Sequence, residues 1–376
     1  MTSLTLAPVA AQARLQDAGR RLAGALPHTI QLLRADRWVY ALIALHALCA
    51  VVLLGATGHT ASLAFASYLG VWPFAFLVLM PVLYLLVGLL RMVHRLDRRR
   101  PLAIRQLFST RRVSHFAAGA LLLSALMIFQ GSFTSVKNAL PGWNGGFLHD
   151  VVQADWDMFL HFGTDPWRYL IAVADAGWER SLIEWNYNQG WFVFCYGTLF
   201  WIAVAPEAAR IRTRYMLSYV LLWTVVGNLM AGLFISAGPA FYHHVTGDET
   251  RFANLLAFLG QGEPTMHSAA TIQSYLWSLY SAREAGFASG ISAFPSMHVA
   301  LVTLNALFIA EWSRRLGLLA FAYVALVVAS SVYLAWHYAI DGYVSVVVTV
   351  AFYYLLRRFV RDLGGSAKAV ATPPPR

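Results

Sequence analysis

The chain has 376 residues, of which 59% are hydrophobic and only 12% are charged. Soluble proteins carry about 25% charged residues, so this composition excludes an ordinary water-facing surface and predicts a membrane protein. The two cysteines, Cys49 and Cys195, lie in apolar runs, so neither a disulfide framework nor a cysteine-ligated metal is expected. A net charge of +10 would indicate nucleic acid in a soluble protein, but its distribution along this chain has another explanation.

Apolar runs recur along the chain, each near the roughly 20 residues that a helix needs to cross a bilayer. They cover residues 38–57, 64–90, 113–132, 189–206, 215–237, 297–312, 317–337 and 341–356. The second run contains Pro73 and Pro81, which predicts a tilted or kinked helix. The sequence therefore predicts an all-helical, polytopic membrane bundle of about eight transmembrane helices.

The basic residues fall on one side of these runs. Of the 28 Lys and Arg residues, 23 lie in the two tails and in the connections after the second, fourth and sixth runs. The other side has only Lys137, Arg168, Arg180, Arg251 and Arg283. Basic residues concentrate on the cytoplasmic side of a membrane protein, so both termini are predicted to be cytoplasmic. The net charge is then an orientation signal, and no nucleic-acid partner is expected.

Three ionisable residues lie at the outer ends of the last three runs: His298, His337 and Asp341. Such residues are costly at membrane depth and require an explanation. Pro295 and Ser296 suit the first turn of a helix, whose backbone N–H groups form an anion site. The four-residue spacing of His337 and Asp341 places both on one face of a helix, where the carboxylate can orient the imidazole. A nucleophile, a second histidine and an anion site together indicate phosphoryl chemistry.

These residues carry a family resemblance. Pro295-Ser296-x-His298 followed by His337-x-x-x-Asp341 resembles the second and third motifs of the type 2 phosphatidic acid phosphatase superfamily, over about residues 215–360. The run from His337 to Tyr343, with Ala351-Phe352-Tyr353-Tyr354, resembles the lipid phosphotransferase branch, which includes inositol phosphorylceramide synthase and, more distantly, sphingomyelin synthase. The segment from Asp157 to Trp167 resembles the outer segment of the inositol phosphorylceramide synthase type.

The chain departs from the family at its phosphate-binding cations. The first motif of the soluble family members has a Lys and an Arg-Pro pair, whereas this chain has Gly238-Pro239 at the corresponding place. The third motif normally opens with Ser-Arg, where this chain has Ser330 and Ser331. Pro239 is therefore retained as a substrate-binding candidate without its cations. A dianionic phosphate or a pentavalent transition state needs charge compensation from elsewhere.

Lys137 is the candidate replacement cation. It is the only lysine outside the C-terminal tail, and it lies on the predicted outer side of the membrane. Arg283 and Arg251 are weaker candidates on the same side. The predicted phosphate- and substrate-binding set is thus Ser296, Lys137, Pro295 and Pro239.

The resemblance implies a mechanism and a set of partners. His337 attacks the phosphorus of a lipid phosphate or phospholipid donor and forms a phosphohistidine, while Asp341 orients the imidazole. His298 protonates the leaving oxygen and then deprotonates the acceptor, which is a lipid alcohol in a transferase. The resemblance implies neither a metal nor another cofactor, and the oligomeric state is not specified.

Two further functions remain open. The acceptor can be water, which would make the protein a lipid-phosphate phosphatase with the same catalytic residues. The missing arginines also allow a catalytically degenerate protein that binds lipid or resembles a transporter. Retention of both histidines and of Asp341 argues against this last interpretation.

Simpler roles compete with the catalytic ones at single residues. The His337–Asp341 pair can fix a turn, Ser296 can act only as a helix cap, and Lys137 can be a solvated or snorkelling side chain. Asn228 is interpreted as an interhelical hydrogen-bond donor or acceptor. Three residues of the outer segment are interpreted as interfacial anchors: His161, Asp165 and Trp167.

The predicted organisation has four parts. They are a cytoplasmic or interfacial arm at 1–36, a two-helix membrane hairpin with a basic cytoplasmic loop at 37–112, a six-helix catalytic core resembling phosphatidic acid phosphatase at 113–360, and a disordered cytoplasmic tail at 361–376. The Ala- and Arg-rich, Lys-poor composition predicts a high-GC bacterium, and hence an inner-membrane protein whose site faces the periplasm.

Overall fold

The computed structural model describes residues 24–95, 108–262 and 264–360. Every regular element in these ranges is helical, and no strand occurs in them, which confirms the predicted fold class. A helix at 24–35 opens the described chain. The earlier part of the predicted arm, most of the basic loop and the tail predicted to be disordered lie outside the described residues.

Six helices of the described chain are long and apolar enough to cross a membrane. They are Arg37–Ala56, Thr60–His94, Thr110–Asn144, Pro206–Leu233, Arg314–Tyr333 and Ala339–Phe359, and each overlaps one predicted span. The two remaining predicted spans are shorter or less apolar. The helix α16 (Met297–Trp312) has 16 residues, or about 24 Å at 1.5 Å per residue. The run at 189–206 ends a helix formed by α9 (Gly177–Trp185), η3 (Asn186–Gly190) and α10 (Trp191–Val204).

The outward faces of the long helices are apolar. The helix α2 (Arg37–Ala56) exposes Leu45, Leu48 and Val52. Rows of exposed apolar side chains are unfavourable in water but match the hydrocarbon of a bilayer. Only 22% of the apolar window of α2 is buried, against 61% for Pro206–Leu233. The helix α2 is therefore peripheral in the bundle, and the helix Pro206–Leu233 is central.

The second predicted span, within Thr60–His94, is irregular and consists of successive helical segments. It consists of α3 (Phe65–Leu69), the π-helical segment η2 (Phe74–Leu79) and α4 (Met80–Arg95). Pro73 immediately precedes η2, and Pro81 lies in the first turn of α4. Because proline lacks a backbone N–H and clashes with the preceding turn, this irregularity agrees with the predicted kink.

The helix α6 (Thr110–Asn144) is much longer than the predicted run at 113–132. Its 35 residues span about 52 Å, which exceeds the roughly 30 Å hydrocarbon core. The helix therefore continues past the end of the predicted apolar run at residue 132, as far as Asn144. Gly145 then ends it in the left-handed conformation, with φ of 73°. As a result, Lys137 projects from a helix and not from a loop.

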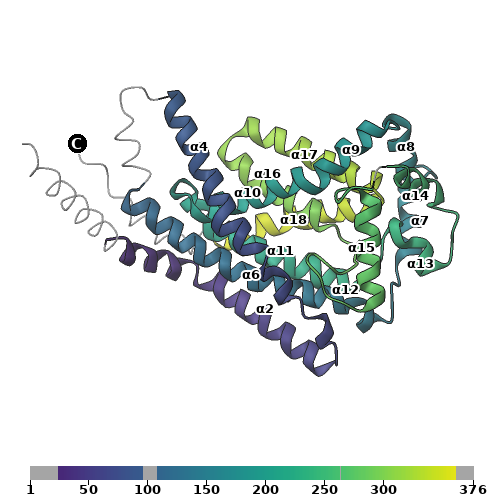
Figure 1. Cartoon of the computed structure of the whole chain (residues 1–376), viewed down its shortest axis with the longest axis horizontal. Helices are drawn as coiled ribbons and strands as arrows, with labels where there is room; N and C mark the ends of the chain where they lie inside the picture. The colour runs from purple at the N-terminus through teal and green to yellow at the C-terminus, as the bar shows by residue number, and fades with distance from the viewer. Residues whose placement is uncertain (1–23, 96–107, 263, 361–376) are drawn as a thin grey trace, which may run out of the picture.

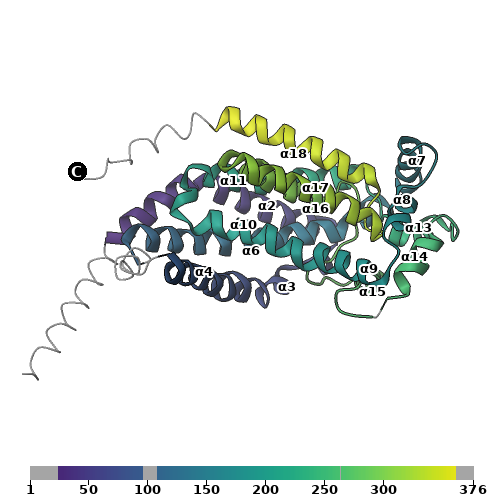
Figure 2. The ribbon, with the colours of Figure 1, turned by 90° about the horizontal axis from the view of Figure 1, so that it is seen from above.

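The helix α16 lies at the centre of the C-terminal half. It packs against α17 (Arg314–Tyr333) and α18 (Ala339–Phe359), and also against α10 and α11 (Ala209–Thr224). Figure 2 shows these helices running side by side along the long axis. The bundle therefore brings the ends of α16, α17 and α18 together.

A polar network joins α2 to this bundle inside the membrane region. His46 of α2 contacts the Ser132 hydroxyl through Nδ1 at 2.8 Å and Asn228 Oδ1 through Nε2 at 3.0 Å. Asn228 lies in the π-helical segment η5 (Val225–Met230) and donates to the Phe133 carbonyl at 3.3 Å. The predicted interhelical hydrogen bond of Asn228 is therefore confirmed.

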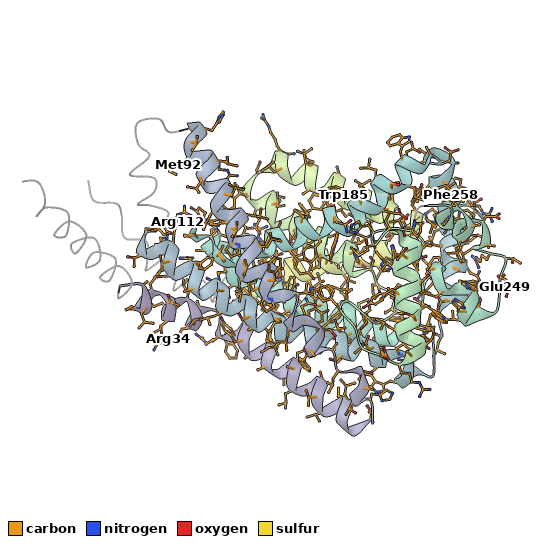
Figure 3. The ribbon with its side chains drawn as sticks, viewed as in Figure 1. Arg34, Met92, Arg112, Trp185, Glu249 and Phe258 are labelled. Carbon is orange, nitrogen blue, oxygen red and sulfur yellow. The ribbon has the colours of Figure 1, made fainter. Side chains whose placement is uncertain are left out.

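Short helices gather at one end of the molecule. They are α7 (Asp150–Leu160), α8 (Pro166–Val173), η6 (Pro239–Phe241), α13 (Tyr242–Thr246), α14 (Ala253–Gly260) and α15 (Ala269–Ala282). In Figure 1, α7, α8, α13 and α14 lie at the right, opposite both ends of the described chain. Arg34 and Arg112 lie at the left of Figure 3, and Glu249 lies at the right. Arg34 and Arg112 therefore lie at the opposite end of the molecule from Glu249.

Candidate active site

His337 and Asp341 form a buried pair where α17 gives way to α18. His337 Nδ1 lies 3.2 Å from Asp341 Oδ2, and the side chains are 9% and 0% exposed. The same oxygen accepts the Tyr338 N–H at 3.1 Å. His337 lies in the loop before α18, whereas Asp341 lies in its first turn. The predicted pairing is present, but it arises from the loop and the helix cap rather than from one helical face.

Burial sets the protonation state of His337. Burial chiefly, assisted by the positive charge of Lys137 and opposed by a hydrogen bond with the backbone of Ala293, lowers the pKa of His337 to about 3. The imidazole is therefore neutral at physiological pH, so a nitrogen lone pair is available for attack. A contact between Nδ1 and the Asp341 carboxylate leaves Nε2 as the nitrogen that can act on a substrate.

The segment with Ser296 and His298 opens α16. The Ser296 hydroxyl accepts the Val299 N–H at 3.4 Å and so caps the helix. The backbone N–H of Ser296 donates to the Asp341 carbonyl at 3.3 Å, and this hydrogen bond links the two predicted motifs directly. Pro295 is buried and follows Phe294 through a cis peptide bond. Ser296 is fully buried, so its side chain acts as a helix cap in this structure.

Two aromatic rings hold the imidazole of His298. The Tyr187 ring is stacked on it, with centroids 4.5 Å apart and planes inclined by 10°. The Trp191 ring lies 4.1 Å from it on an inclined plane, and the Trp191 indole N–H donates to the His298 carbonyl at 3.0 Å. His298 and His337 lie within electrostatic range of each other. The two predicted catalytic histidines are thus brought to one place.

Lys137 reaches the same place from α6. Its charge interacts with both His298 and His337, and it forms no hydrogen bond or ion pair with any residue of the described ranges. Its stem packs against the backbone of Gly290, where an added Cβ would lie 3.0 Å from Lys137 Cγ. Gly290 also has a φ of 91°, so a side chain at this position is excluded twice. The charge of Lys137 therefore lies within electrostatic range of both histidines.

The Gly238-Pro239 loop lies between the two motif loops. The Ala293 N–H donates to the Ser236 carbonyl at 2.8 Å, and the Ala240 N–H donates to the Ala335 carbonyl at 2.9 Å. A Cβ on Gly238 would lie 2.8 Å from the Trp336 carbonyl oxygen, so only glycine permits this approach. Pro239 is buried here. Its loop supports the site but supplies no cation.

The Ser330-Ser331 pair, in which Ser331 stands where the family has an arginine, contributes no charge. Ser330 donates to the Leu326 carbonyl at 2.7 Å, and Ser331 donates to the Val328 carbonyl at 2.8 Å. Both hydroxyls therefore bond back to their own helix instead of pointing toward a substrate.

The two weaker cation candidates are also engaged or distant. Arg251 forms ion pairs with Asp155 at 2.6 Å and with Asp165 at 3.2 Å. Burial, the largest single influence, lowers the pKa of Arg251, but these carboxylates together raise it above its usual value. It ties the two outer segments together and is not free for phosphate. Arg283 is exposed at the end of α15. Trp167 is 5% exposed, so its interpretation as an interfacial anchor is wrong.

Two aspartates of α7 organise the site from outside, and sequence reasoning missed this role. Asp150 accepts the N–H groups of Ala237 and Gly238 and the Tyr338 hydroxyl, each at 2.8 Å. Burial raises its pKa, while these hydrogen bonds oppose the shift.

Asp157 caps α18 directly. It accepts the N–H groups of Ala339 and Ile340 at 2.6 and 2.8 Å, immediately after His337 in the chain. Asp150 and Asp157 are seven residues apart, which is about two helical turns, and therefore share one face of α7. This spacing could have indicated that the two aspartates act together, although nothing in the sequence identified the backbone N–H groups that they bind.

The comparisons with known proteins agree with this geometry. The model of the PAP2 superfamily matches residues 153–355, and the chain therefore belongs to the PAP2 superfamily. Membership indicates a lipid enzyme of the phosphatase or phosphotransferase type. No curated protein and no solved structure matches the chain. Both predicted motifs lie inside the matched segment, whereas Lys137 lies before it.

Proposed function

We propose that the protein is a membrane lipid phosphotransferase that carries the transferred group on His337 as a phosphohistidine. The observation that carries this proposal is the buried pair of His337 and Asp341, 3.2 Å apart, with His298 and Lys137 within electrostatic range. A neutral, oriented imidazole beside a cation suits attack on phosphorus. Membership in the PAP2 superfamily supports the same chemistry.

The proposed reaction has two steps. The His337 Nε2 lone pair attacks phosphorus, the bond to the leaving oxygen breaks, and His298 donates the proton that this oxygen takes up. His298 then removes the proton of the acceptor hydroxyl, whose oxygen attacks the phosphohistidine and restores the neutral imidazole. Asp341 compensates the positive charge on the imidazole ring between the steps, and Lys137 compensates the charge of the phosphoryl oxygens.

The charge of the site favours a phosphodiester donor over a monoester. A phosphodiester carries one negative charge, whereas a phosphate monoester carries about −1.5 to −2 at neutral pH. Lys137 is the cation whose charge reaches both histidines, and the family's other cation positions hold Gly238 and Ser331. One positive charge matches one negative charge. The resemblance to inositol phosphorylceramide synthase supports the same class, in which a phospholipid supplies its phospho-headgroup.

The experiment that tests this proposal supplies labelled phospholipids to the purified protein with and without an alcohol acceptor. A transferase forms product in proportion to the acceptor and releases little phosphate. Release of phosphate, or of headgroup phosphate, without any acceptor would instead establish the hydrolytic alternative. If the folded protein neither forms product nor releases phosphate, and His337→Ala still performs the biological role, the lipid-binding or transporter-like alternative would be favoured.

The shifted pKa of His337 predicts an unusual pH dependence. Because the pKa lies near 3, lowering the pH from 7 to 5 leaves the nucleophile neutral, and we expect its initial rate of phosphorylation to be retained. A histidine with the ordinary pKa of about 6.5 would be about 76% neutral at pH 7 but only about 3% neutral at pH 5, and the rate would fall about 25-fold. Rapid-quench labelling at both pH values distinguishes these outcomes, and a fall of that size would contradict the assigned environment.

We also propose that residues 113–360 form the catalytic unit, that both termini are cytoplasmic, and that the site faces the periplasm of a bacterial inner membrane. The unequal distribution of Lys and Arg supports this orientation. Labelling of a cysteine introduced near residue 265 by a membrane-impermeant reagent tests it, and labelling from the cytoplasmic side alone would overturn it.

A further inference from the structure

A π-helical turn interrupts the helix that passes beside α16. The segment η3 (Asn186–Gly190) joins α9 to α10 without a break in the chain direction, and α10 packs against α16 (Figures 1 and 2). A π-bulge displaces one residue from the regular helical face, and such bulges are frequent at functional sites. In this protein the displaced turn carries Tyr187, whose ring covers His298.

The hydroxyl of Tyr187 has no hydrogen-bond partner in the described part of the chain. The side chain is only 2% exposed, yet its hydroxyl neither donates nor accepts a hydrogen bond within the described residues. An unsatisfied buried hydroxyl costs free energy that phenylalanine would avoid with the same packing. Other buried tyrosines of the bundle do have partners: Tyr215 donates to Asn305 at 2.7 Å, and Tyr338 donates to Asp150 at 2.8 Å.

The position of this hydroxyl indicates what it serves. The Tyr187 ring is stacked on His298, and the phenol also lies within electrostatic range of Asp341. Asp341 in turn contacts His337. The Tyr187 ring thus covers one of the two histidines, and its hydroxyl lies within electrostatic range of the carboxylate that contacts the other.

We propose that Tyr187 is a substrate-binding residue whose hydroxyl donates a hydrogen bond to a non-bridging phosphoryl oxygen. This inference rests on the proposed function. It supplies a neutral donor in addition to Lys137, in a site where Gly238 and Ser331 stand at two of the family's cation positions. A neutral donor binds a phosphoryl oxygen without adding charge, so it preserves the match to a monoanionic phosphodiester.

Orthovanadate binding tests this inference, because vanadate adopts the five-coordinate geometry of the phosphoryl transition state. We compare the wild type with Tyr187→Phe in detergent, measuring vanadate affinity by calorimetry and unfolding temperature without vanadate. A hydrogen bond to a charged acceptor corresponds to about a 10- to 100-fold loss of affinity when it is removed. We expect this loss with an unchanged or higher unfolding temperature, since the hydroxyl has no partner to lose.

Two further variants complete the experiment. Tyr40→Phe is the matched control, because the Tyr40 hydroxyl also lacks a partner but belongs to α2, outside the candidate site. It should bind vanadate like the wild type, and His337→Ala should not bind it. Wild-type affinity in Tyr187→Phe would overturn the inference and leave the proposed function intact. Equal binding by His337→Ala, or no binding by the wild type, would overturn both.

Discussion

Replacing His337 by alanine should abolish turnover while leaving the protein folded. The imidazole is the proposed covalent nucleophile, and the proposed reaction gives the neighbouring His298 only proton transfer. Removal of a nucleophile that acts within a catalytic unit costs about 10⁴- to 10⁶-fold in rate. The measurement is the rate of product formation from labelled phospholipid, with folding checked by thermal unfolding of the purified variant.

The matched control for this substitution is His244→Ala. His244 is an exposed histidine stacked on Trp277 in the outer layer, so its loss should leave turnover near the wild-type rate. Asp341→Asn should reduce turnover by a smaller factor of about 10²- to 10⁴-fold, because an amide can still contact His337 but no longer compensates its positive charge. Substantial turnover by His337→Ala would contradict the assignment of the nucleophile.

Lys137→Met should lower turnover by about 10²- to 10³-fold, the cost of removing one stabilising donor from a transition state. Methionine keeps an unbranched stem against Gly290, so the packing is largely retained while the charge is lost. Because the charge acts most strongly on the developing phosphoryl charge, we expect the larger part of the loss in kcat rather than in KM. Steady-state kinetics with a labelled phospholipid donor provide this comparison.

Arg283→Met is the control for Lys137→Met. It also removes one cation from the predicted outer side, but Arg283 is exposed at the end of α15 and is not among the charges that act on either histidine. The control should retain turnover. Full turnover in folded Lys137→Met would show that the lysine only snorkels, and the site would then need another source of positive charge.

The meeting of the two motifs could be predicted because it depends on local rules. Helix-start residues place Ser296 before α16, and the four-residue spacing places Asp341 near His337. The alternation of basic and non-basic connections then puts both motifs at one end of the bundle. The prediction of Lys137 at the site used the same rule, together with the missing cations.

The extent of α6 could not be predicted from hydropathy. Polar residues end its apolar run, so hydropathy defined the span only as far as residue 132. In the structure Gln130, Ser132, Thr134 and Ser135 are all buried, because they face protein rather than lipid. Hydropathy measures how well a segment suits lipid. It therefore does not detect the part of a helix that is surrounded by other helices and carries polar side chains.

The supporting residues were missed for a different reason. Asp150 bonds to Tyr338, which is 188 positions away, and Asp157 bonds to backbone N–H groups that any residue would provide. Contacts of this kind leave no pattern in a single sequence. The π-helical turn that carries Tyr187 could not be predicted from the sequence either, since its residues continue an ordinary helical stretch.

The most direct test of the central claim is isolation of the covalent intermediate. The purified protein is mixed briefly with a panel of phosphorus-labelled phospholipids, quenched in alkali, and digested, and the labelled peptide is identified. The account predicts an acid-labile phosphoryl group on the peptide that contains His337, present in the wild type and absent from His337→Ala. Label on another residue, or turnover without any labelled intermediate under rapid quench, would contradict it.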